Sequence, residues 1–593
     1  MCGIVGFFGK KDARDIVIGG LEKLEYRGYD SAGIALVHNN EIEIYKEKGR
    51  VQELKKLCDY SYSANIAIGH TRWATHGEPS VVNAHPHRSF NKRFVVVHNG
   101  VIDNYKILKS SYLKDYSFVS DTDTEVVINV IEEFAKTMSV KEAIIKTMDI
   151  LEGSYAMLIL DREDLGKMYL VKNKTPLLIG HGTDGITVGS DTMVLVETCD
   201  EYLVLNDKTF IIINNEHEFE LYDADGNSLP YKMTKLDVKF EDFDKGTYEH
   251  YMLKEIEEQP GVIRNLISAY FEGDEVIVNQ EIISAIRKCD KINLVACGTS
   301  MYASYMAKYY FEKLCGIPSE VFCASELVYS TPLIKDHPFF IFLSQSGETA
   351  DSLAVMKNCK RKKYPTLAIT NTENSSMNHL ADYTMHIHAG KEIAVASTKA
   401  YVAQITTCAI LAKAIAKTKI ELKSAFNRVA LAIENVLENK YMVKAIAEKL
   451  YKHNDVFYIG RGIDYWVCLE SALKLKEISY IHTEAFPSGE LKHGTIALID
   501  KETPVIAICT QEGTNGIVRS NLTETLSRGA TGYVISMEGI AHADDDIIIP
   551  NVPHYLTPVV SVVVTQLIAY YTAILRGNDV DKPKNLAKSV TVE

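Results

Sequence analysis

The chain has 593 residues, of which 46% are hydrophobic and 24% charged, with a net charge of −14 and a pI of about 5.8. This length corresponds to about three to four domains, and the composition is typical of soluble globular proteins. The negative charge argues against general nucleic-acid binding but permits small anionic ligands. Eleven scattered cysteines argue against a disulfide framework, and no basic and apolar leader precedes the first predicted strand; both favour the cytoplasm.

The N-terminal segment MCGIVG places a cysteine at position 2. Removal of the initiator methionine would leave Cys2 with a thiol and a free α-amine on one carbon. The reference pKa of an α-amine, about 7.7–8.0, lets it act as a base near neutrality and activate its own thiol. Cys2 is therefore a candidate N-terminal nucleophile. The alternative is a small apolar residue that begins a buried strand.

Residues 1–235 alternate short strands with helices and turns. Apolar runs predict strands over Cys2–Phe8, Ala32–Val37, Ile66–His70, Phe94–His98, Tyr155–Leu160 and Met168–Val171. Apolar periodicity predicts helices over Asp12–Tyr26, Asp123–Ala135 and Val140–Leu151. The polar, glycine-ended stretch Glu241–Gly246 predicts a linker, and Thr247–Pro260 after it predicts a helix.

Three short clusters in this segment carry polar groups. Residues 71–77 (TRWATHG) place Arg72 beside hydroxyls, and arginine grips a carboxylate through two parallel hydrogen bonds. Asn99 and Gly100 end a predicted strand with an amide and a backbone N–H, the donors that an oxyanion hole uses. Residues 121–125 (DTDTE), which include Asp123, lie at a predicted helix start, where Asp121 or Thr122 can simply be an N-cap. Taken singly, each cluster also fits an ordinary structural role.

Together, and in this order after MCGIVG, these clusters resemble the class II glutamine amidotransferase domain, an N-terminal-nucleophile αββα sandwich. The resemblance implies Cys2 as nucleophile, with Asn99 and Gly100 holding the oxyanion. It implies a glutamine site in which Arg72 binds the α-carboxylate and Asp123 the α-ammonium. The pocket would further be lined by Trp73, Thr75 and His76. This domain would span residues 1–240, and residues 241–280 would form a linker and lead-in helix.

The second half of the chain contains an internal repeat. Residues 293–298 (NLVACG) and 456–462 (VFYIGRG) are both apolar strands that run into a glycine turn, and Gly298 and Gly462 lie 164 positions apart. Residues 339–347 and 505–513 repeat the pattern, with their final glycines 166 positions apart. The two nearly equal offsets predict a duplicated α/β domain, over residues 281–425 and 445–583. Ligands on such parallel sheets bind at the carboxyl ends of the strands.

Residues 343–349 (LSQSGET) join a predicted strand end to a helix. Their hydroxyls, amide and helix-start N–H groups suit a phosphate monoester without a metal, and no Gly-Lys-Ser/Thr makes this a P-loop. A plain serine-rich helix cap is the alternative. The arrangement resembles the sugar isomerase domain, twice over. The implied binding site for fructose 6-phosphate consists of Thr299, Ser300, Ser344, Gln345, Ser346, Thr349 and Ser397.

A third cluster follows in the second repeat. Lys474 and Glu477 are three residues apart and share a helix face, a spacing that usually means a surface ion pair. An aldose–ketose conversion, however, needs a carboxylate that moves a proton between C1 and C2 and a cation near the enolate. His493 is a candidate to open the sugar ring by proton transfer. In the tail, residues 584–593, a docked Lys588 would form a Schiff base with a ketose carbonyl, although a loose tail is the default.

Seven motifs, spread over the whole chain, resemble the glucosamine-6-phosphate synthase family: YRGYDSAG, HTRWATHGE, LSQSGETAD, ASTKA, LKLKEISYIH, ELKHG and NLAKSVTVE. The resemblance implies that L-glutamine hydrolysed at Cys2 supplies ammonia through a channel gated by Trp73. The ammonia would convert D-fructose 6-phosphate to D-glucosamine 6-phosphate, the first step of hexosamine biosynthesis. It also implies a homodimer in which His493 completes the partner's site, and no cofactor, pyridoxal included. Ser471 stands where the family often has glycine, and Thr495 where it often has proline.

The predicted fold class is α/β: an α+β αββα sandwich followed by two three-layer, flavodoxin-like parallel-sheet domains. The uncharged stretch Pro558–Leu575 contains serine, threonine and glutamine, so we expect a buried core or interface helix rather than a membrane span. His85 and His87 would need a third ligand to hold a metal, so a loop role is favoured and no metal site is expected. No nucleic-acid or membrane partner is expected.

Three rival functions fit parts of the sequence. A phosphoribosyl-transferring amidotransferase would need a pyrophosphate-binding acidic strand–loop, where a duplicated isomerase unit stands instead. A non-catalytic sugar-phosphate sensor would not need Cys2, Glu477 and Lys588 together. A deglycase would reuse the isomerase pair but normally lacks the amidotransferase half.

Overall fold

The computed structural model describes residues 2–74, 76–214, 218–236, 245–330, 332–334, 336–416 and 420–590, apart from the side chain of Tyr26. The chain divides into two compact units, which are residues 1–244 with 589–593 (unit 1) and residues 245–588 (unit 2). The division at 244–245 falls in the range predicted as a linker, of which residues 241–244 lie outside the described part.

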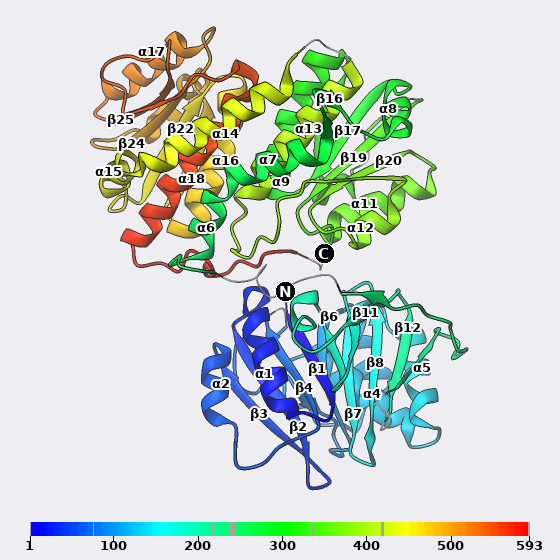
Figure 1. Cartoon of the computed structure of the whole chain (residues 1–593). Helices are drawn as coiled ribbons and strands as arrows, with labels where there is room; N and C mark the ends of the chain where they lie inside the picture. The colour runs from blue at the N-terminus through cyan, green and yellow to red at the C-terminus, as the bar shows by residue number, and fades with distance from the viewer. Residues whose placement is uncertain are drawn as a thin grey trace. The chain divides into compact units, whose positions relative to one another are not determined.

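Unit 1 contains two antiparallel sheets stacked face to face (Figure 1). The first has the order β14 (Thr234–Lys235), β11 (Glu201–Val204), β9 (Leu178–Gly182), β10 (Gly185–Gly189), β1 (Gly3–Gly9), β4 (Ile66–Arg72), β2 (Ser31–His38) and β3 (Glu41–Lys48). The second has the order β13 (Phe219–Tyr222), β12 (Thr209–Ile213), β8 (Asp164–Asn173), β7 (Gly153–Asp161), β6 (Phe94–Ile102) and β5 (His87–Arg88).

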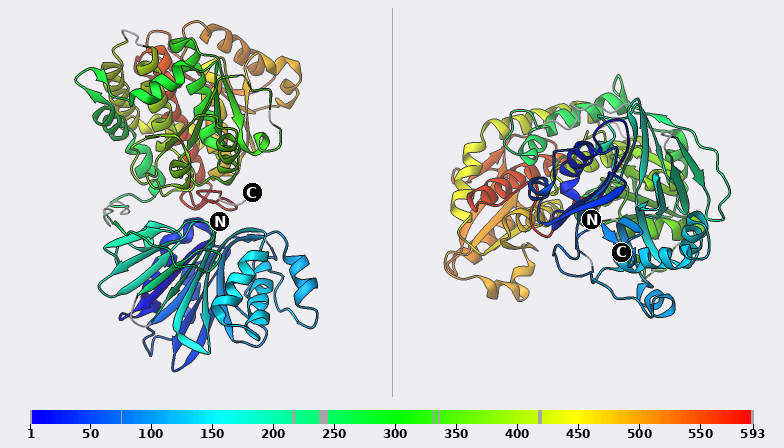
Figure 2. Two further views of the ribbon diagram at one scale, coloured as in Figure 1. Left: turned by 90° about the vertical axis from the view of Figure 1, so that its right-hand side faces the viewer. Right: turned by 90° about the horizontal axis from the view of Figure 1, so that it is seen from below.

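Strand periodicity explains why this sandwich has helices outside both sheets. Along β6, Val95 and Val97 face the other sheet, whereas Phe94 and Val96 pack beneath helices. Both faces of the strand are therefore buried, which is why it reads as a continuous apolar run. Figure 2 shows helices beside these strands. The helices of unit 1 are α1 (Ala13–Leu24), α2 (Val51–Leu57), α3 (Tyr105–Tyr112), α4 (Asp123–Ala135) and α5 (Val140–Ile150).

Unit 2 contains two parallel five-stranded sheets with the same strand order. The first sheet has β18 (Ser319–Cys323), β17 (Lys291–Ala296), β19 (Pro338–Ser344), β20 (Thr366–Thr370) and β21 (Tyr383–His386). The second has β23 (His482–Pro487), β22 (Asp455–Gly460), β24 (Pro504–Cys509), β25 (Thr531–Met537) and β26 (Ile547–Ile549). The matching order agrees with the duplication that the sequence predicts, and the predicted α/β fold class is confirmed.

Helices cover both faces of each parallel sheet. In β19, Phe339 and Ile341 join the large core shared by the two halves, whereas Phe340 and Phe342 join a smaller core under α11 and α12. The helices are α6 (Tyr251–Glu257), α7 (Gln259–Tyr270), α8 (Gln280–Arg287), α9 (Gly298–Tyr310), α10 (Ala324–Leu327), α11 (Ala350–Arg361), α12 (Ser376–Leu380), α13 (Lys399–Ala416), α14 (Leu422–Glu438), α15 (Lys440–Leu450), α16 (Ile463–Ser479), α17 (Asn515–Leu526) and α18 (Thr557–Leu575). A short hairpin, β15 (Phe271–Glu272) with β16 (Glu275–Val276), follows α7.

The uncharged helix α18 lies in the core of unit 2, against α15 and α16. Within the described residues, His554–Leu575 is the one helical stretch long and apolar enough to cross a membrane, and 83% of its most apolar window is buried in the fold. Two of its polar side chains are hydrogen-bonded there, since Gln566 accepts from Gln259 and Thr565 accepts from Ser471. The expected buried core helix is confirmed.

Two details differ from the sequence-based expectations. The segment Thr247–Pro260 is not one helix, because α6 ends at Glu257 and α7 begins at Gln259. Pro260 lies in the first turn of α7, where its missing N–H costs nothing, so the proline starts a helix rather than ending one. The predicted strand Met168–Val171 is the centre of a longer strand, β8, because its pairing with β7 continues beyond these residues.

Candidate functional sites

Cys2 lies next to the first strand of unit 1, where the pairing of β1 with β4 brings it to the start of the loop after Arg72. Its Sγ lies 3.2 Å from the backbone N of Trp73, which donates to it, and 3.5 Å from the Trp73 carbonyl. Burial raises the pKa of the Cys2 thiol, and the Arg72 guanidinium opposes that rise. A thiol with a raised pKa needs a base to become a nucleophile at neutral pH.

Asn99 and Gly100 approach Cys2 from β6, in the second sheet. Asn99 Nδ2 donates to the Cys2 carbonyl over 3.0 Å, which fixes the amide beside the thiol-bearing residue. Gly100 has φ +129, and a Cβ there would lie 1.9 Å from the carbonyl oxygen of Ser154. Only glycine permits this backbone so close to the neighbouring strand β7. The two predicted oxyanion donors are adjacent residues of β6, and Asn99 contacts Cys2 directly.

Arg72 is buried beneath the loop that follows β4. Its guanidinium donates to the carbonyls of His76, Gly77 and Glu78, the last two over 3.1 and 3.4 Å. Burial lowers the pKa of Arg72, while the nearby acidic groups Asp30 and Asp123 oppose that fall. The predicted cation therefore shares a region with Cys2 and Asp123.

The remaining glutamine-site candidates lie around the same loop. The Trp73 ring is half-buried, edge-on to Tyr29 at 6.2 Å between centroids. The His76 ring is edge-on to Tyr105 at 5.3 Å. Thr75 lies outside the described residues.

Asp123 is the first residue of α4, and Thr122, one of the two predicted cap candidates, is the N-cap. The Thr122 hydroxyl caps the helix by accepting from Glu125 N. The Asp123 carboxylate instead accepts from Ile102 N over 2.8 Å and from Thr124 N over 3.0 Å. Asp123 thus joins the start of α4 to the end of β6, the strand that carries Asn99.

Sequence reasoning missed a buried stack of histidines behind this site: His70, His85, His87 and His98. The His70 and His85 rings stack at 4.1 Å, and His85 Nδ1 accepts a hydrogen bond from His98 N. Burial lowers the pKa of His70 to about 3, so its imidazole is neutral. In the described part of the chain, no three histidine, cysteine or acidic side chains are grouped to hold a metal. His85 lies in the loop between β4 and β5, and its hydrogen bond with His98 N joins that loop to β6.

In unit 2, the candidate phosphate loop connects β19 to α11. Ser344 Oγ accepts from Gly347 N over 3.0 Å and lies 3.2 Å from the Thr349 hydroxyl. The Gln345 carbonyl accepts from Asn371 N, and Ser346 Oγ accepts from Glu348 N. Among the described residues, no side chain caps the first turn of α11, which leaves its N–H groups available to an anion.

The two neighbouring candidates come from the start of α9, where Thr299 and Ser300 follow β17. Strand β17 pairs in parallel with β19, so the two loops meet at one edge of the sheet. Ser300 Oγ accepts from Gln404 Nε2 over 2.9 Å, whereas Thr299 faces α16 and accepts from Lys474 Nζ over 2.9 Å. Thr299 therefore links the phosphate edge to the third cluster.

Gly347 gives this loop a testable constraint. Its φ is +68, and a Cβ would lie 2.1 Å from Ser375 Oγ. A left-handed backbone costs a residue with a side chain about 1–2 kcal/mol. Displacing Ser375 costs about as much again, so we expect Gly347→Ala to lower the free energy of unfolding by more than the backbone cost alone. Chemical denaturation of the full chain measures this. Gly316→Ala is the matched control, since φ is +67 there with nothing within 4 Å; an equal loss in both variants would contradict the tight packing.

The third cluster is buried rather than exposed. The Lys474 side chain is 1% exposed, and its Nζ lies 2.5 Å from Glu477 Oε2 and 3.5 Å from Glu470 Oε1. Burial acts to lower the pKa of Lys474, but neighbouring carboxylates, Glu470 foremost, outweigh it and the pKa is raised. The surface ion-pair interpretation is wrong. Glu470 escaped sequence reasoning, although its spacing of four from Lys474 on one helix face was a usable signal.

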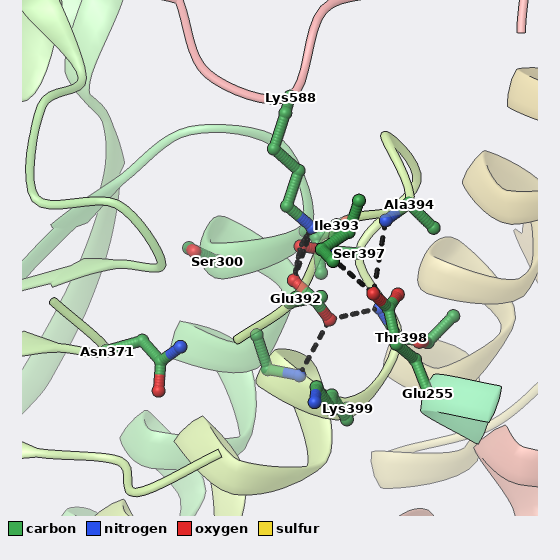
Figure 3. Close-up of polar contacts among 12 residues, drawn as sticks. Glu255, Ser300, Asn371, Glu392, Ile393, Ala394, Ser397, Thr398, Lys399 and Lys588 are labelled. Carbon is green, nitrogen blue, oxygen red and sulfur yellow. Dashed lines mark hydrogen bonds and ion pairs between the residues drawn. The ribbon is translucent and has the colours of Figure 1, made fainter. Parts of the chain in front are cut away.

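Lys588 is held by residues of the first parallel-sheet half (Figure 3). Its Nζ lies 2.5 Å from Glu392 Oε2 and 3.3 Å from Ser397 Oγ, and its side chain is 4% exposed. Ser397 therefore lies beside Lys588 and donates to Glu392. Nothing in the spacing of the sequence pointed to Glu392, because its partner is nearly two hundred residues away.

His493 lies at the end of an exposed 3-10 turn, Glu490–His493. Among the described residues, its ring has no hydrogen bond to Lys474, Glu477 or Lys588. The structure thus brings together the buried lysines and carboxylates of unit 2 and leaves His493 on the surface.

Family models match both units. The Glutamine amidotransferase domain model matches residues 71–197, and the SIS domain model matches residues 285–414 and 449–576. Curated glutamine–fructose-6-phosphate aminotransferases (isomerizing) are similar over 100% of this chain and 100% of their own length, with 49% identity for those of Bacillus cereus and Geobacillus kaustophilus and 48% for that of Listeria monocytogenes. The chain belongs to this aminotransferase family. The enzyme class predicted from the sequence is confirmed, whereas the rival functions share only part of this organisation.

A solved structure supports the fold of unit 2. The C-terminal domain of glucosamine-fructose-6-phosphate aminotransferase from Francisella tularensis is 36% identical, with a TM-score of 0.55. It is matched over 100% of its length by 57% of this chain. The duplicated parallel-sheet architecture is therefore that of the family.

Proposed function

We propose that this protein converts D-fructose 6-phosphate and L-glutamine into D-glucosamine 6-phosphate and L-glutamate. The observation that carries the proposal is the pairing of two chemically distinct sites, a half-buried Cys2 beside amide and guanidinium donors and a buried lysine–carboxylate cluster beside a hydroxyl-lined loop. Full-length similarity to aminotransferases of that name supports the same pairing of substrates.

In unit 1, the Cys2 thiol would attack the glutamine amide and release ammonia from a thioester. The α-amine, freed by loss of Met1, would take the thiol proton. The buried thiol needs such a base because burial raises its pKa. Asn99 and Gly100 would donate to the oxyanion. Arg72 would bind the α-carboxylate and Asp123 the α-ammonium, with Trp73, Thr75 and His76 lining the pocket.

In unit 2, the phosphate would bind the loop after β19 through Ser344, Gln345, Ser346 and Thr349, with Thr299, Ser300 and Ser397 nearby. No basic side chain is needed, because helix N–H groups and hydroxyls supply the donors. Lys588 would form a Schiff base with the ketose carbonyl. After ammonia replaces the lysine, Glu477 would move the proton from C1 to C2 and Lys474 would stabilise the developing negative charge.

We further propose the assembly that this chemistry requires. His493, exposed on its own chain, would open the sugar ring in the partner subunit of a homodimer. Ammonia would pass through an internal channel gated by Trp73, since free ammonia is protonated and lost in bulk water. The protein would act in the cytoplasm without a cofactor.

The test is an assay with glutamine labelled at its amide nitrogen and fructose 6-phosphate. We expect labelled glucosamine 6-phosphate and one glutamate per product. Adding unlabelled ammonium chloride should not dilute the label, because channelled ammonia does not mix with the bulk. Unlabelled product, or no amino sugar at all, would contradict the proposal. Omitting glutamine is the control.

A further inference from the structure

Glu392 is bound so that it presents one oxygen to Lys588. Glu392 Oε1 accepts from Thr398 N over 2.9 Å and from Ala400 N over 3.0 Å, at the start of α13. Glu392 Oε2 accepts from Ser397 Oγ over 2.7 Å, and its other neighbour is Lys588 Nζ (Figure 3). The side chain is 0% exposed. The carboxylate is therefore fixed, desolvated and directed at the lysine nitrogen.

A second buried carboxyl, Glu255, limits the charge around this pair. Glu255 Oε1 accepts from the N–H groups of Ile393 and Ala394, the two residues after Glu392. Its Oε2 has no hydrogen-bond partner among the described residues. Burial first, and then the Glu392 charge, raise the pKa of Glu255 well above its usual range. Glu255 therefore holds a proton near neutrality and leaves Glu392 as the anion that faces Lys588.

A second lysine of this region, Lys399, has a carboxylate partner of its own. Lys399 Nζ lies 2.6 Å from Glu258 Oε2, and the Lys399 side chain, like that of Lys588, is 4% exposed. Two buried lysines thus have one carboxylate each, and only the Lys588 partner lies on the loop between β21 and α13. The pairs Lys588–Glu392 and Lys399–Glu258 provide a built-in comparison.

Resting on the proposed function, we propose that Glu392 is a catalytic residue, the internal base that frees the Lys588 amine and the counterion of the Schiff base that follows. The carboxylate takes one proton from the ammonium, and the neutral amine attacks the ketose carbonyl carbon. The carbinolamine oxygen then receives that proton and one from the former ammonium nitrogen, and leaves as water. The product is a protonated imine, C=N–H⁺, and Glu392 is a carboxylate again.

Each step conserves charge at the buried site, which is why one fixed carboxylate suffices. Burial favours a neutral amine and a neutral acid over two separated ions, so the proton transfer is not opposed by desolvation. The Lys588 ammonium holds the pKa of Glu392 below its usual range, against the effect of burial. Once the lysine is neutral, that stabilisation ends and burial favours the protonated acid. Before and after the reaction, one cation faces one anion.

The first experiment measures the rate at which borohydride reduces the imine of fructose 6-phosphate onto Lys588, located by peptide mass spectrometry. We expect Glu392→Gln to lower this rate about 100-fold or more at neutral pH, as loss of a general base does. In the variant the rate should rise with pH, since solvent must deprotonate the lysine, whereas in the unaltered protein it should be level from pH 6.5 to 8 (about the working range of an internal base). A merely structural role would lower the rate without changing the shape of the pH profile.

Two further variants separate chemistry from folding. Glu392→Ala should regain trapping in millimolar formate, because the removed carboxyl leaves a buried space next to Lys588. Glu258→Gln is the matched control and should trap at the normal rate. Unaltered trapping in Glu392→Gln, or no rescue by formate together with an unchanged pH profile, would overturn the assignment of Glu392. If the unaltered protein traps no sugar on Lys588, the proposed function fails instead.

Discussion

Replacing Cys2 with alanine is expected to lower glutamine-dependent formation of the amino sugar by roughly a thousandfold or more, because the nucleophile is lost outright. Isomerisation of fructose 6-phosphate should persist, since the groups assigned to the sugar lie in unit 2. The measurements are the rate of glucosamine 6-phosphate formation with glutamine and the rate of fructose 6-phosphate isomerisation. Intact mass spectrometry should show that the unaltered protein has lost Met1.

Cys58→Ala is the matched control for this prediction. Cys58 is a buried cysteine of the same unit whose thiol donates to the Leu54 carbonyl, so it has a structural partner and no catalytic neighbour. Its replacement should leave the glutamine-dependent rate near normal. Equal losses in both variants would indicate damage to unit 1, and a Cys2→Ala variant still active with glutamine would remove the nucleophile assignment.

Replacing Lys474 with methionine is expected to destabilise unit 2 and to abolish amino-sugar formation. The change keeps the volume of the side chain but removes the cation from the half-buried Glu477 and from the buried Glu470, whose pKa burial raises to about 8. Breaking a buried ion pair from one side costs about 3–5 kcal/mol. Thermal denaturation of the full chain should therefore show a melting temperature several degrees lower, while glutamine hydrolysis in unit 1 is retained.

Two comparisons make the Lys474 result specific. Lys476 lies on the same helix but is exposed, so Lys476→Met should change neither stability nor activity appreciably. The double variant Lys474→Met with Glu477→Gln should regain part of the lost stability, because the carboxylate that had lost its cation has been removed. A single variant as stable as the unaltered protein would contradict the buried network.

Local sequence patterns predicted much of the fold. The helix Asp123–Ala135 has its predicted bounds, because a threonine cap and an apolar face are both encoded within a few residues. The equal spacing of strand–glycine turns indicated two repeated sheets, which the matching strand orders agree with. The helix predicted over Thr247–Pro260 was wrong because a proline can begin a helix as well as end one, and the choice depends on what the next turn packs against.

The sequence by itself identified the family and made Cys2, Lys474, Glu477 and Lys588 the candidates for its chemistry, because short motifs and helical spacing are local properties of a chain. Only the tertiary structure brought Glu392 to Lys588 and Thr299 to Lys474, and showed that the Lys474 pair is buried. These contacts join residues more than a hundred positions apart. Burial and charge, which decide whether a lysine is a cation or a nucleophile, come from such distant neighbours and leave no pattern in the sequence.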